Sequence, residues 1–168
     1  CLGEGVWRCV ANLPYNAGTR MITRMLDSPV RFDRLVVMVQ KEVAERLVAT
    51  PGDRKRGSLS VFTEARAIAR IAIRVPPGAF HPPPRVHSAV VEMRLRDKPA
   101  IGCARPSVFD QLVRTLFVQP RKTIRNNLCS AFERTRVDAL LESVGLDSKR
   151  RPSTLTLDEI VLVAEALS

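Results

Sequence analysis

Apolar residues in the first 96 positions form either short continuous runs or spaced patterns. The segments 6–11, 35–39, 68–75 and 87–96 have the length and residue content of strands. Between them, 19–26, 41–49 and 58–66 predict helices, and alternating strands and helices are typical of an α/β layer. We expect 6–11 and 35–39 to be buried strands, the latter on both faces, and 68–75 and 87–96 to pair antiparallel at a sheet edge.

The last third of the chain spaces its apolar residues only as helices do. It predicts helices at 107–117, 121–132 and 138–144 and a last one that begins at a capping box of Thr156 and Glu159. Segment 97–106 has two prolines, one glycine and no periodicity, which predicts a linker. We therefore expect part of an α/β domain over residues 1–96, a linker at 97–106 and a small all-α domain over 107–168.

Charge adds a preference for polyanions, because 27 Lys and Arg against 17 Asp and Glu give a net charge of +10. Two segments concentrate this charge, a loop near residue 55 and the helices after residue 113. Both fit contacts to an RNA backbone, and a solvated surface is the alternative for either. The candidate RNA-binding residues are Arg54, Lys55, Arg56, Arg114, Arg121, Lys122 and Arg125.

Cysteine spacing and hydropathy exclude other classes. The four cysteines, at 1, 9, 103 and 129, have no C-x-x-C spacing and no nearby histidine, which argues against a metal site or a disulfide framework. No apolar run approaches the roughly 18 to 20 residues that span a bilayer. We expect a cytoplasmic monomer without a metal and without a membrane segment.

The turn Asn12-Leu13-Pro14-Tyr15 follows the first predicted strand, at the edge where α/β folds bind ligands. The Asn12 side-chain oxygen and the Leu13 carbonyl can accept the two hydrogens of an exocyclic amine. Accepting both directs the nitrogen lone pair at an electrophile and stabilises the positive charge that develops. Pro14 stiffens the turn, and Tyr15 offers a ring face to a flipped base or a sulfonium methyl. A plain Asn-Pro turn is the alternative.

The connection at 76–84 holds five of the chain's twelve prolines around a single aromatic residue, Phe80. An aromatic ring in such a stiff loop can stack on the second face of a base, an interaction worth roughly 1 to 3 kcal/mol. A Phe80 buried under its own loop is the alternative. Together with the Asn12 turn, Phe80 indicates a site that holds a base between two rings.

These motifs, in order, resemble the ribosomal small-subunit (16S) rRNA adenine N6,N6-dimethyltransferase family (KsgA/RsmA). The resemblance rests on Asn12-Leu13-Pro14-Tyr15-Asn16, Gln40-Lys41-Glu42-Val43, Val75-Pro76-Pro77 and residues 79–91, and on 117–128, which resemble a characteristic helix of the family's C-terminal domain. It implies a Rossmann-like, S-adenosylmethionine-dependent methyltransferase domain followed by a small helical domain. It also implies methyl transfer from S-adenosylmethionine to two adjacent adenines of a hairpin loop near the 3′ end of 16S rRNA.

Carried over by position, the resemblance gives Asn12 and Tyr15 contacts to both the amine and the cofactor, and makes Phe80 the opposing stack. The family's glycine-rich cofactor loop and acidic residues lie before this motif and are not in the sequence, and Gly3-Glu4-Gly5 precedes a strand, so it is interpreted as a loop. We therefore expect an N-terminally truncated chain that is inactive alone. Arg56 stands where the family usually has an aromatic residue.

Two other hypotheses stay open. One is a non-enzymatic ribosome-assembly or RNA-binding factor of the same fold, which S-adenosylmethionine binding would distinguish. The other is a relative that methylates adenine in 23S rRNA, against which the helix containing Arg121, Lys122 and Thr123 argues.

Overall fold

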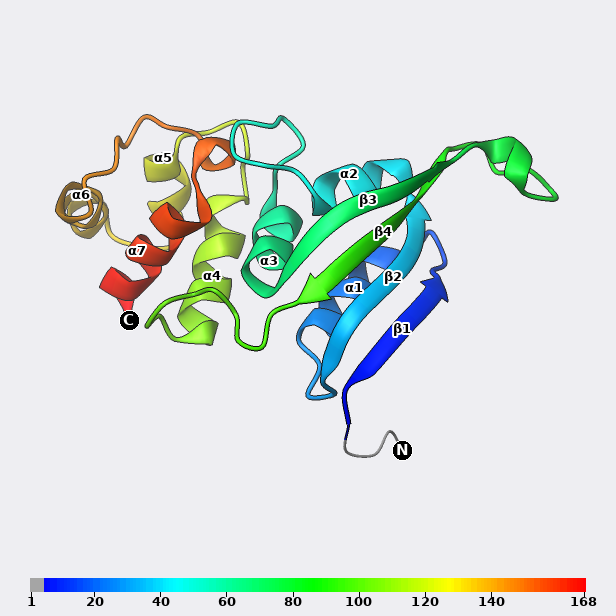
Figure 1. The fold of residues 1–168 in the computed structure, drawn as a ribbon. Coiled ribbons are helices and arrows are strands. Elements are labelled where there is room, and N and C mark those ends of the chain that lie inside the picture. The colour runs from blue at the N-terminus through cyan, green and yellow to red at the C-terminus, as the bar shows by residue number, and fades with distance from the viewer. Residues whose placement is uncertain (1–4) are drawn as a thin grey trace. The chain divides into compact units, whose positions relative to one another are not determined.

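The computed structural model describes residues 5–168, so most of the Gly3-Glu4-Gly5 motif lies outside the described residues. Its contacts divide the chain into two compact units (Figure 1). The first contains the chain up to Val48 together with Arg66–Pro99, and the second contains Ala49–Ala65 together with Ala100–Ser168. The sequence of each unit is therefore discontinuous.

A four-stranded sheet forms the centre of the first unit. Its strands are β1 (Trp7–Asn12), β2 (Phe32–Gln40), β3 (Ala67–Val75) and β4 (Ser88–Leu95), in the order β1-β2-β4-β3. β1 runs parallel to β2, and β4 is antiparallel to both of its neighbours. The expected antiparallel pair is confirmed, with β3 at the edge and β4 inside the sheet.

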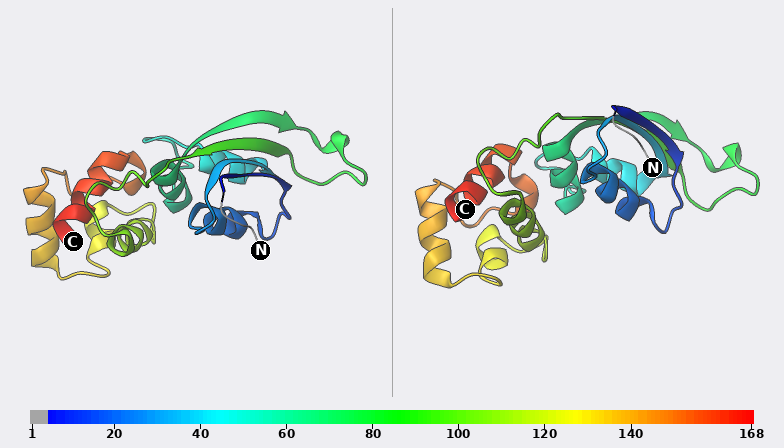
Figure 2. Two further views of the ribbon diagram at one scale, coloured as in Figure 1. Left: turned by 60° about the horizontal axis from the view of Figure 1, so that its bottom comes forward. Right: turned by 90° about the horizontal axis from the view of Figure 1, so that it is seen from below.

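One face of this sheet is closely packed. α1 (Gly18–Leu26) and α2 (Lys41–Leu47) lie on it (Figure 2). Alternate residues of the inner strands point at these helices because successive strand side chains face opposite ways. The residues buried in this way are Leu35, Val37 and Val39 of β2 and Ala89, Val91 and Met93 of β4.

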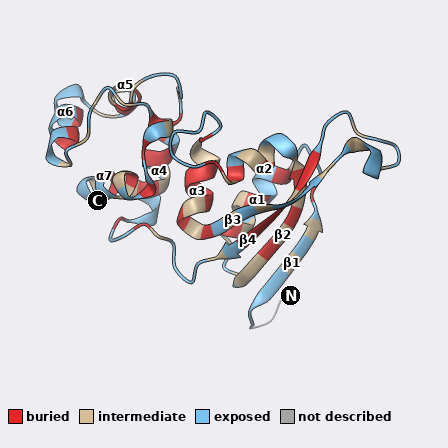
Figure 3. Ribbon diagram, turned by 45° about the horizontal axis from the view of Figure 1, so that its top comes forward, coloured by how far each residue is buried: buried red, intermediate tan, exposed pale blue. Residues whose placement is uncertain are grey.

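The burial expected for the first two strands is wrong. Val10 of β1 is 81% exposed, and Val36 and Met38 of β2 are only half-buried (Figure 3). Within residues 5–168, β1 has one neighbouring strand and no helix covers its outward face, so its apolar side chains meet solvent. A continuous apolar run here marks one buried face, and the second face is partly open.

The second unit is helical. It comprises α3 (Ser58–Arg66, except for its last residue), α4 (Pro106–Leu116), α5 (Ile124–Leu128), α6 (Arg134–Ser143) and α7 (Leu157–Leu167), and each helix contributes to one apolar core. The core includes Val61, Phe62, Phe109, Leu112, Leu128, Leu141 and Ile160. Two single 3-10 turns, at Pro77–Ala79 and Pro152–Thr154, complete the described secondary structure.

This division differs from the expected boundaries in two places. Residues 49–65, expected in the α/β part, belong to the helical unit because α3 packs into its core. The expected linker is also packed, since Ile101 and Ala104 are buried and the Cys103 N–H donates to Glu165 Oε1 at 2.6 Å. Two apolar residues three positions apart are too few to produce a periodic pattern.

Helix ends follow local chemistry. The capping box is confirmed: Thr156 and Glu159 each accept a hydrogen bond from the other's backbone N–H at the start of α7. α5 is much shorter than the expected 121–132 because Thr123 caps it, accepting from the Asn126 N–H. α4 begins at Pro106 instead of Ser107, which places proline in the first turn, where its missing N–H costs nothing.

Candidate functional site

The turn after β1 leaves two acceptors open. The Leu13 N–H bonds to the Met38 carbonyl at 3.1 Å, which ties the turn to β2, and the Leu13 side chain is buried. The Pro14 carbonyl accepts from the Gly18 N–H at 2.8 Å, which joins the turn to α1. Within the described residues, no donor reaches the Asn12 side chain or the Leu13 carbonyl oxygen. Both are therefore available to an external N–H donor.

Tyr15 is held from the opposite side of the sheet order. Its hydroxyl lies 2.6 Å from Ser88 Oγ, at the first residue of β4, while 37% of the side chain stays exposed. Ser88 is itself buried, so the bond fixes one end of the phenol and leaves the ring accessible. Sequence reasoning missed Ser88, since nothing local to residue 88 shows that it meets residue 15.

Phe80 lies in the loop between β3 and β4, directly after the 3-10 turn Pro77–Ala79. The loop extends beyond the strand ends (Figure 1), and Phe80 is half-buried. Among the described residues, Tyr15 and Phe80 share no ring contact. The turn and the loop are nevertheless joined, because the loop ends at the Ser88 that Tyr15 contacts.

The structure brings both groups of basic residues into the helical unit. The Gly52 N–H bonds to the Ser153 carbonyl at 2.8 Å, which attaches the loop of Arg54 and Lys55 to that unit. Arg54, Lys55, Arg114, Arg121 and Lys122 are exposed, and Arg114 also lies 5.3 Å from the centre of the Phe62 ring. These five remain candidates for contacts to an RNA backbone.

Arg56 is a correction to the predicted RNA-binding set. Its side chain is fully buried, donates to the Ala49 carbonyl at 3.1 Å and pairs with Glu64 at 2.8 Å. A side chain enclosed in this way cannot reach a phosphate, so Arg56 stabilises the loop from within. The burial also agrees with the aromatic residue expected at this position in the family that the sequence resembles.

Arg125 is also occupied, although less completely. Its guanidinium forms two hydrogen bonds of 2.5 Å to the Asp138 carboxylate. This bond raises the pKa of Arg125 and lowers the pKa of Asp138. The side chain is 27% exposed, so a phosphate would have to compete with Asp138 for the guanidinium.

Asn127 is a structural residue that sequence reasoning missed. Its side chain is buried, accepts from the Gln119 N–H at 2.9 Å and donates to the Gln119 and Thr123 carbonyls at 3.1 Å. It thereby holds the turn that carries Arg121 and Lys122. A polar residue three positions after Ile124, on the apolar side of α5, is the signal that could have revealed it.

Neither a metal centre nor a spanning helix is found in the described part of the chain. Residues 5–168 contain no cluster of three His, Cys, Asp or Glu side chains arranged to hold a metal ion. Over the same residues, each helix is too short or too polar to cross a membrane.

Comparisons with known proteins agree with the resemblance. A family model described as ribosomal RNA adenine dimethylase matches residues 5–168. Ribosomal RNA small subunit methyltransferase A of Chlamydia trachomatis serovar D is 39% identical over 165 residues, which cover 98% of this chain and 60% of that protein. The protein of the same name from Syntrophotalea carbinolica is 41% identical, over 99% of this chain and 63% of its own length. The chain thus spans about 60% of the length of these curated relatives.

Solved structures share the fold. A dimethyladenosine transferase from Plasmodium falciparum aligns with a TM-score of 0.82 at 21% identity, over 97% of this chain and 67% of that one. The 23S rRNA methyltransferase ErmE aligns with a TM-score of 0.70, also at 21% identity, over 99% of this chain and 67% of its own. The fold is therefore that of an α/β methyltransferase. From the family model and the identities, the chain belongs to the ribosomal RNA adenine dimethylase family.

Proposed function

We propose that the protein to which this chain belongs transfers methyl groups from S-adenosylmethionine to the N6 amines of two adjacent adenosines in a 3′-terminal hairpin loop of 16S rRNA. The reaction would take place during maturation of the small subunit in the cytoplasm. The observation that carries the proposal is the pair of open acceptors at Asn12 and Leu13, beside a tyrosine ring that is fixed at one end.

The geometry of the turn supports amine activation. An adenine amine carries two hydrogens, and the Asn12 oxygen and the Leu13 carbonyl are acceptors on consecutive residues. Accepting both hydrogens directs the nitrogen lone pair away from the base plane and stabilises the cationic nitrogen as the new bond forms. Tyr15 and Phe80 would stack on the two faces of the adenine. No residue of the site has to titrate for this step.

This chain supplies only part of a cofactor site. S-adenosylmethionine, when bound, provides an electrophilic methyl group on a sulfonium. Asn12 and Tyr15 fit the methyl end of that cofactor, because an amide oxygen and an aromatic face both attract positive charge. In relatives with this motif, the ribose and adenine of the cofactor are expected to be held by residues that precede it. Cofactor binding by the chain alone is thus expected to be weak.

In the helical unit, five exposed cations would hold the rRNA backbone. They are Arg54, Lys55, Arg114, Arg121 and Lys122. Contacts of this kind position an RNA without reading its sequence, and the choice of base then falls to the site around Asn12. The protein would act on 16S rRNA as a monomer.

The test introduces Asn12→Ala into the complete protein that contains this chain and maps N6,N6-dimethyladenosine in the rRNA of both subunits. Loss of one preorganised acceptor should lower the methylation rate about 100- to 1000-fold. Asn12→Gln, which moves the same amide by one methylene, should be almost as damaging. Both variants should melt like the unmodified protein, since Asn12 is exposed and its side chain bonds to no other described residue.

Three results would each reject part of the proposal. Normal 16S rRNA dimethylation by Asn12→Ala would remove Asn12 from the reaction. Dimethyladenosine in 23S rRNA instead of 16S rRNA would assign the protein to the other subunit. Failure of the complete, unmodified protein to bind S-adenosylmethionine in calorimetry would favour a non-enzymatic assembly factor.

A further inference from the structure

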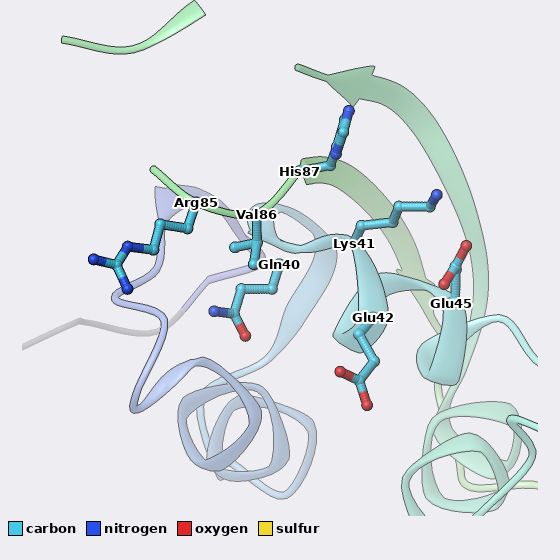
Figure 4. Close-up of a pocket in the computed structure, with 7 residues that line it drawn as sticks. All are labelled: Gln40, Lys41, Glu42, Glu45, Arg85, Val86 and His87. Carbon is cyan, nitrogen blue, oxygen red and sulfur yellow. The ribbon is translucent and has the colours of Figure 1, made fainter. Parts of the chain in front are cut away.

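A pocket of about 360 Å³ lies in the first unit, next to the proposed amine site (Figure 4). It opens where β2 passes into α2 and is bordered by the last residues of the loop that contains Phe80. Its lining residues are Gln40, Lys41, Glu42, Glu45, Arg85, Val86 and His87. The proposed reaction uses none of them.

Two backbone connections place this pocket beside the turn. Leu13 bonds to Met38, and β2 continues from there to Gln40, the first lining residue. Gln40 pairs across the strands with Ser88, whose hydroxyl contacts Tyr15. A base held at Tyr15 therefore has this pocket as its neighbour within the same unit.

The cations of the pocket are available to a ligand. Glu42 is engaged by an ion pair with Arg46, and in Figure 4 its carboxylate points away from the other polar ends. Within residues 5–168, neither the Lys41 ammonium nor the Arg85 guanidinium has a side-chain partner. An anion that enters would meet two charges that no carboxylate of the chain neutralises directly.

The two ends of the pocket differ in character. Arg85 and Gln40 extend to one side, whereas Lys41, Glu45 and His87 lie on the other (Figure 4). Arginine binds phosphate oxygens through two parallel N–H groups, so the Arg85 end suits a phosphate. Glu45 makes the opposite end mixed in charge, which suits a ribose hydroxyl or a base edge. The arrangement matches one nucleotide unit more closely than a simple anion.

Exposure favours a polymer over a small metabolite. Five of the seven lining residues are exposed, and only Gln40 and Glu45 are half-buried. Small-molecule sites usually enclose most of their ligand, whereas a strand that continues on both sides of the bound nucleotide needs an open site.

We propose that this pocket binds the nucleotide adjacent to the target adenosine in the RNA strand, with Arg85 on its phosphate and Lys41 as the second cation. The inference rests on the proposed function, since that function makes RNA the ligand. The role of the pocket would be to hold the strand while the adenine lies between the two rings. Lys41 and Arg85 are positioning residues in this scheme, and neither takes part in methyl transfer.

The test measures binding of this chain to a fluorescein-labelled RNA hairpin with two adjacent adenosines in its loop. The variant Lys41→Ala/Arg85→Ala is compared with Arg24→Ala/Lys98→Ala, which removes two exposed cations of the same unit that also have no side-chain partner among the described residues. The pocket variant should weaken binding at least tenfold, and its salt dependence should fall by about 1.4 in log-log slope, for two lost phosphate contacts. The control should stay within about twofold of the unmodified chain.

A second arm replaces the phosphates that flank one adenosine by neutral methylphosphonates. The modified RNA should bind the unmodified chain more weakly but lose nothing further on the pocket variant. Equal affinities of the pocket and control variants would overturn the proposal, as would a full additional loss on the pocket variant. Displacement of the hairpin by an equal concentration of inorganic phosphate would also overturn it, because the site would then recognise a free anion.

The two proposals can fail separately. If the pocket variant binds RNA normally while Asn12→Ala abolishes methylation, only the pocket assignment is lost. If the pocket variant loses RNA binding while Asn12→Ala methylates normally, the catalytic assignment is lost and the RNA site remains.

Discussion

Replacing Asn127 by alanine removes the side chain that closes the turn between α4 and α5. Three hydrogen bonds of 2.9 to 3.1 Å disappear, all to backbone groups of Gln119 and Thr123. At about 1 kcal/mol of net stability for each bond, the loss is about 3 kcal/mol. Water at the exposed Gln119 recovers part of this, and alanine gains about 0.5 kcal/mol of helix propensity. The expected destabilisation is about 2 kcal/mol.

Urea unfolding followed by circular dichroism at 222 nm measures this change, with Asn126→Ala as the matched control. Asn126 is the adjacent amide of the same helix, but it is exposed and its side chain bonds to no other described residue. Asn126→Ala should therefore be neutral or slightly stabilising, so the two variants should differ in sign. Equal midpoints for the two variants would refute the assignment of Asn127 as the support of this turn.

The remaining predictions concern packing and pH. Arg56→Ala should cost about 2 to 3 kcal/mol in thermal or urea unfolding, because it strands a partly buried Glu64, while removal of the exposed Arg54 should cost under about 0.5 kcal/mol. Gly145→Ala should cost about 1 kcal/mol for its φ of +68°, and Gly102→Ala at +58° more than that, since its Cβ would lie 2.1 Å from Glu165 Oε1; similar melting temperatures would contradict this. Glu159 hydrogen-bonds to Arg150, which holds its pKa below the ordinary 4.5, so its contribution is complete above that pH and is lost as the pH falls through the lower folded value. Glu159→Gln should flatten this acid limb in a pH series of unfolding curves, and an unchanged limb would remove Glu159 as its source.

Local pattern was sufficient for several elements. The spaced apolar residues of 58–66 predicted α3 with the bounds that the structure has, and Thr156 with Glu159 predicted the start of α7. Both signals depend on residues within one or two turns of each other. The partner of α3 could not be predicted in this way, because its apolar face packs against helices that begin some 40 residues later.

The candidate site shows the same limit. The turn at Asn12 could be predicted because its chemistry lies within four consecutive residues. Its support by Ser88 and the neighbouring pocket depend on strand order, which periodicity does not reveal. Arg56 was placed on the surface because arginine is rarely buried without a partner, and the partner, Glu64, is recognisable only once α3 is in place.

The discontinuous helical unit has a consequence for synthesis and for engineering. Residues 49–65 leave the ribosome first, and 34 residues of the other unit, 66–99, follow before the rest of the helical unit appears. At roughly 5 to 20 residues per second, the apolar side of α3 has no partner for about 2 to 7 s. For the same reason, no single cut isolates this unit. A chimera that exchanges it between relatives must carry both segments, or α3 will be left facing a core to which its sequence was not matched.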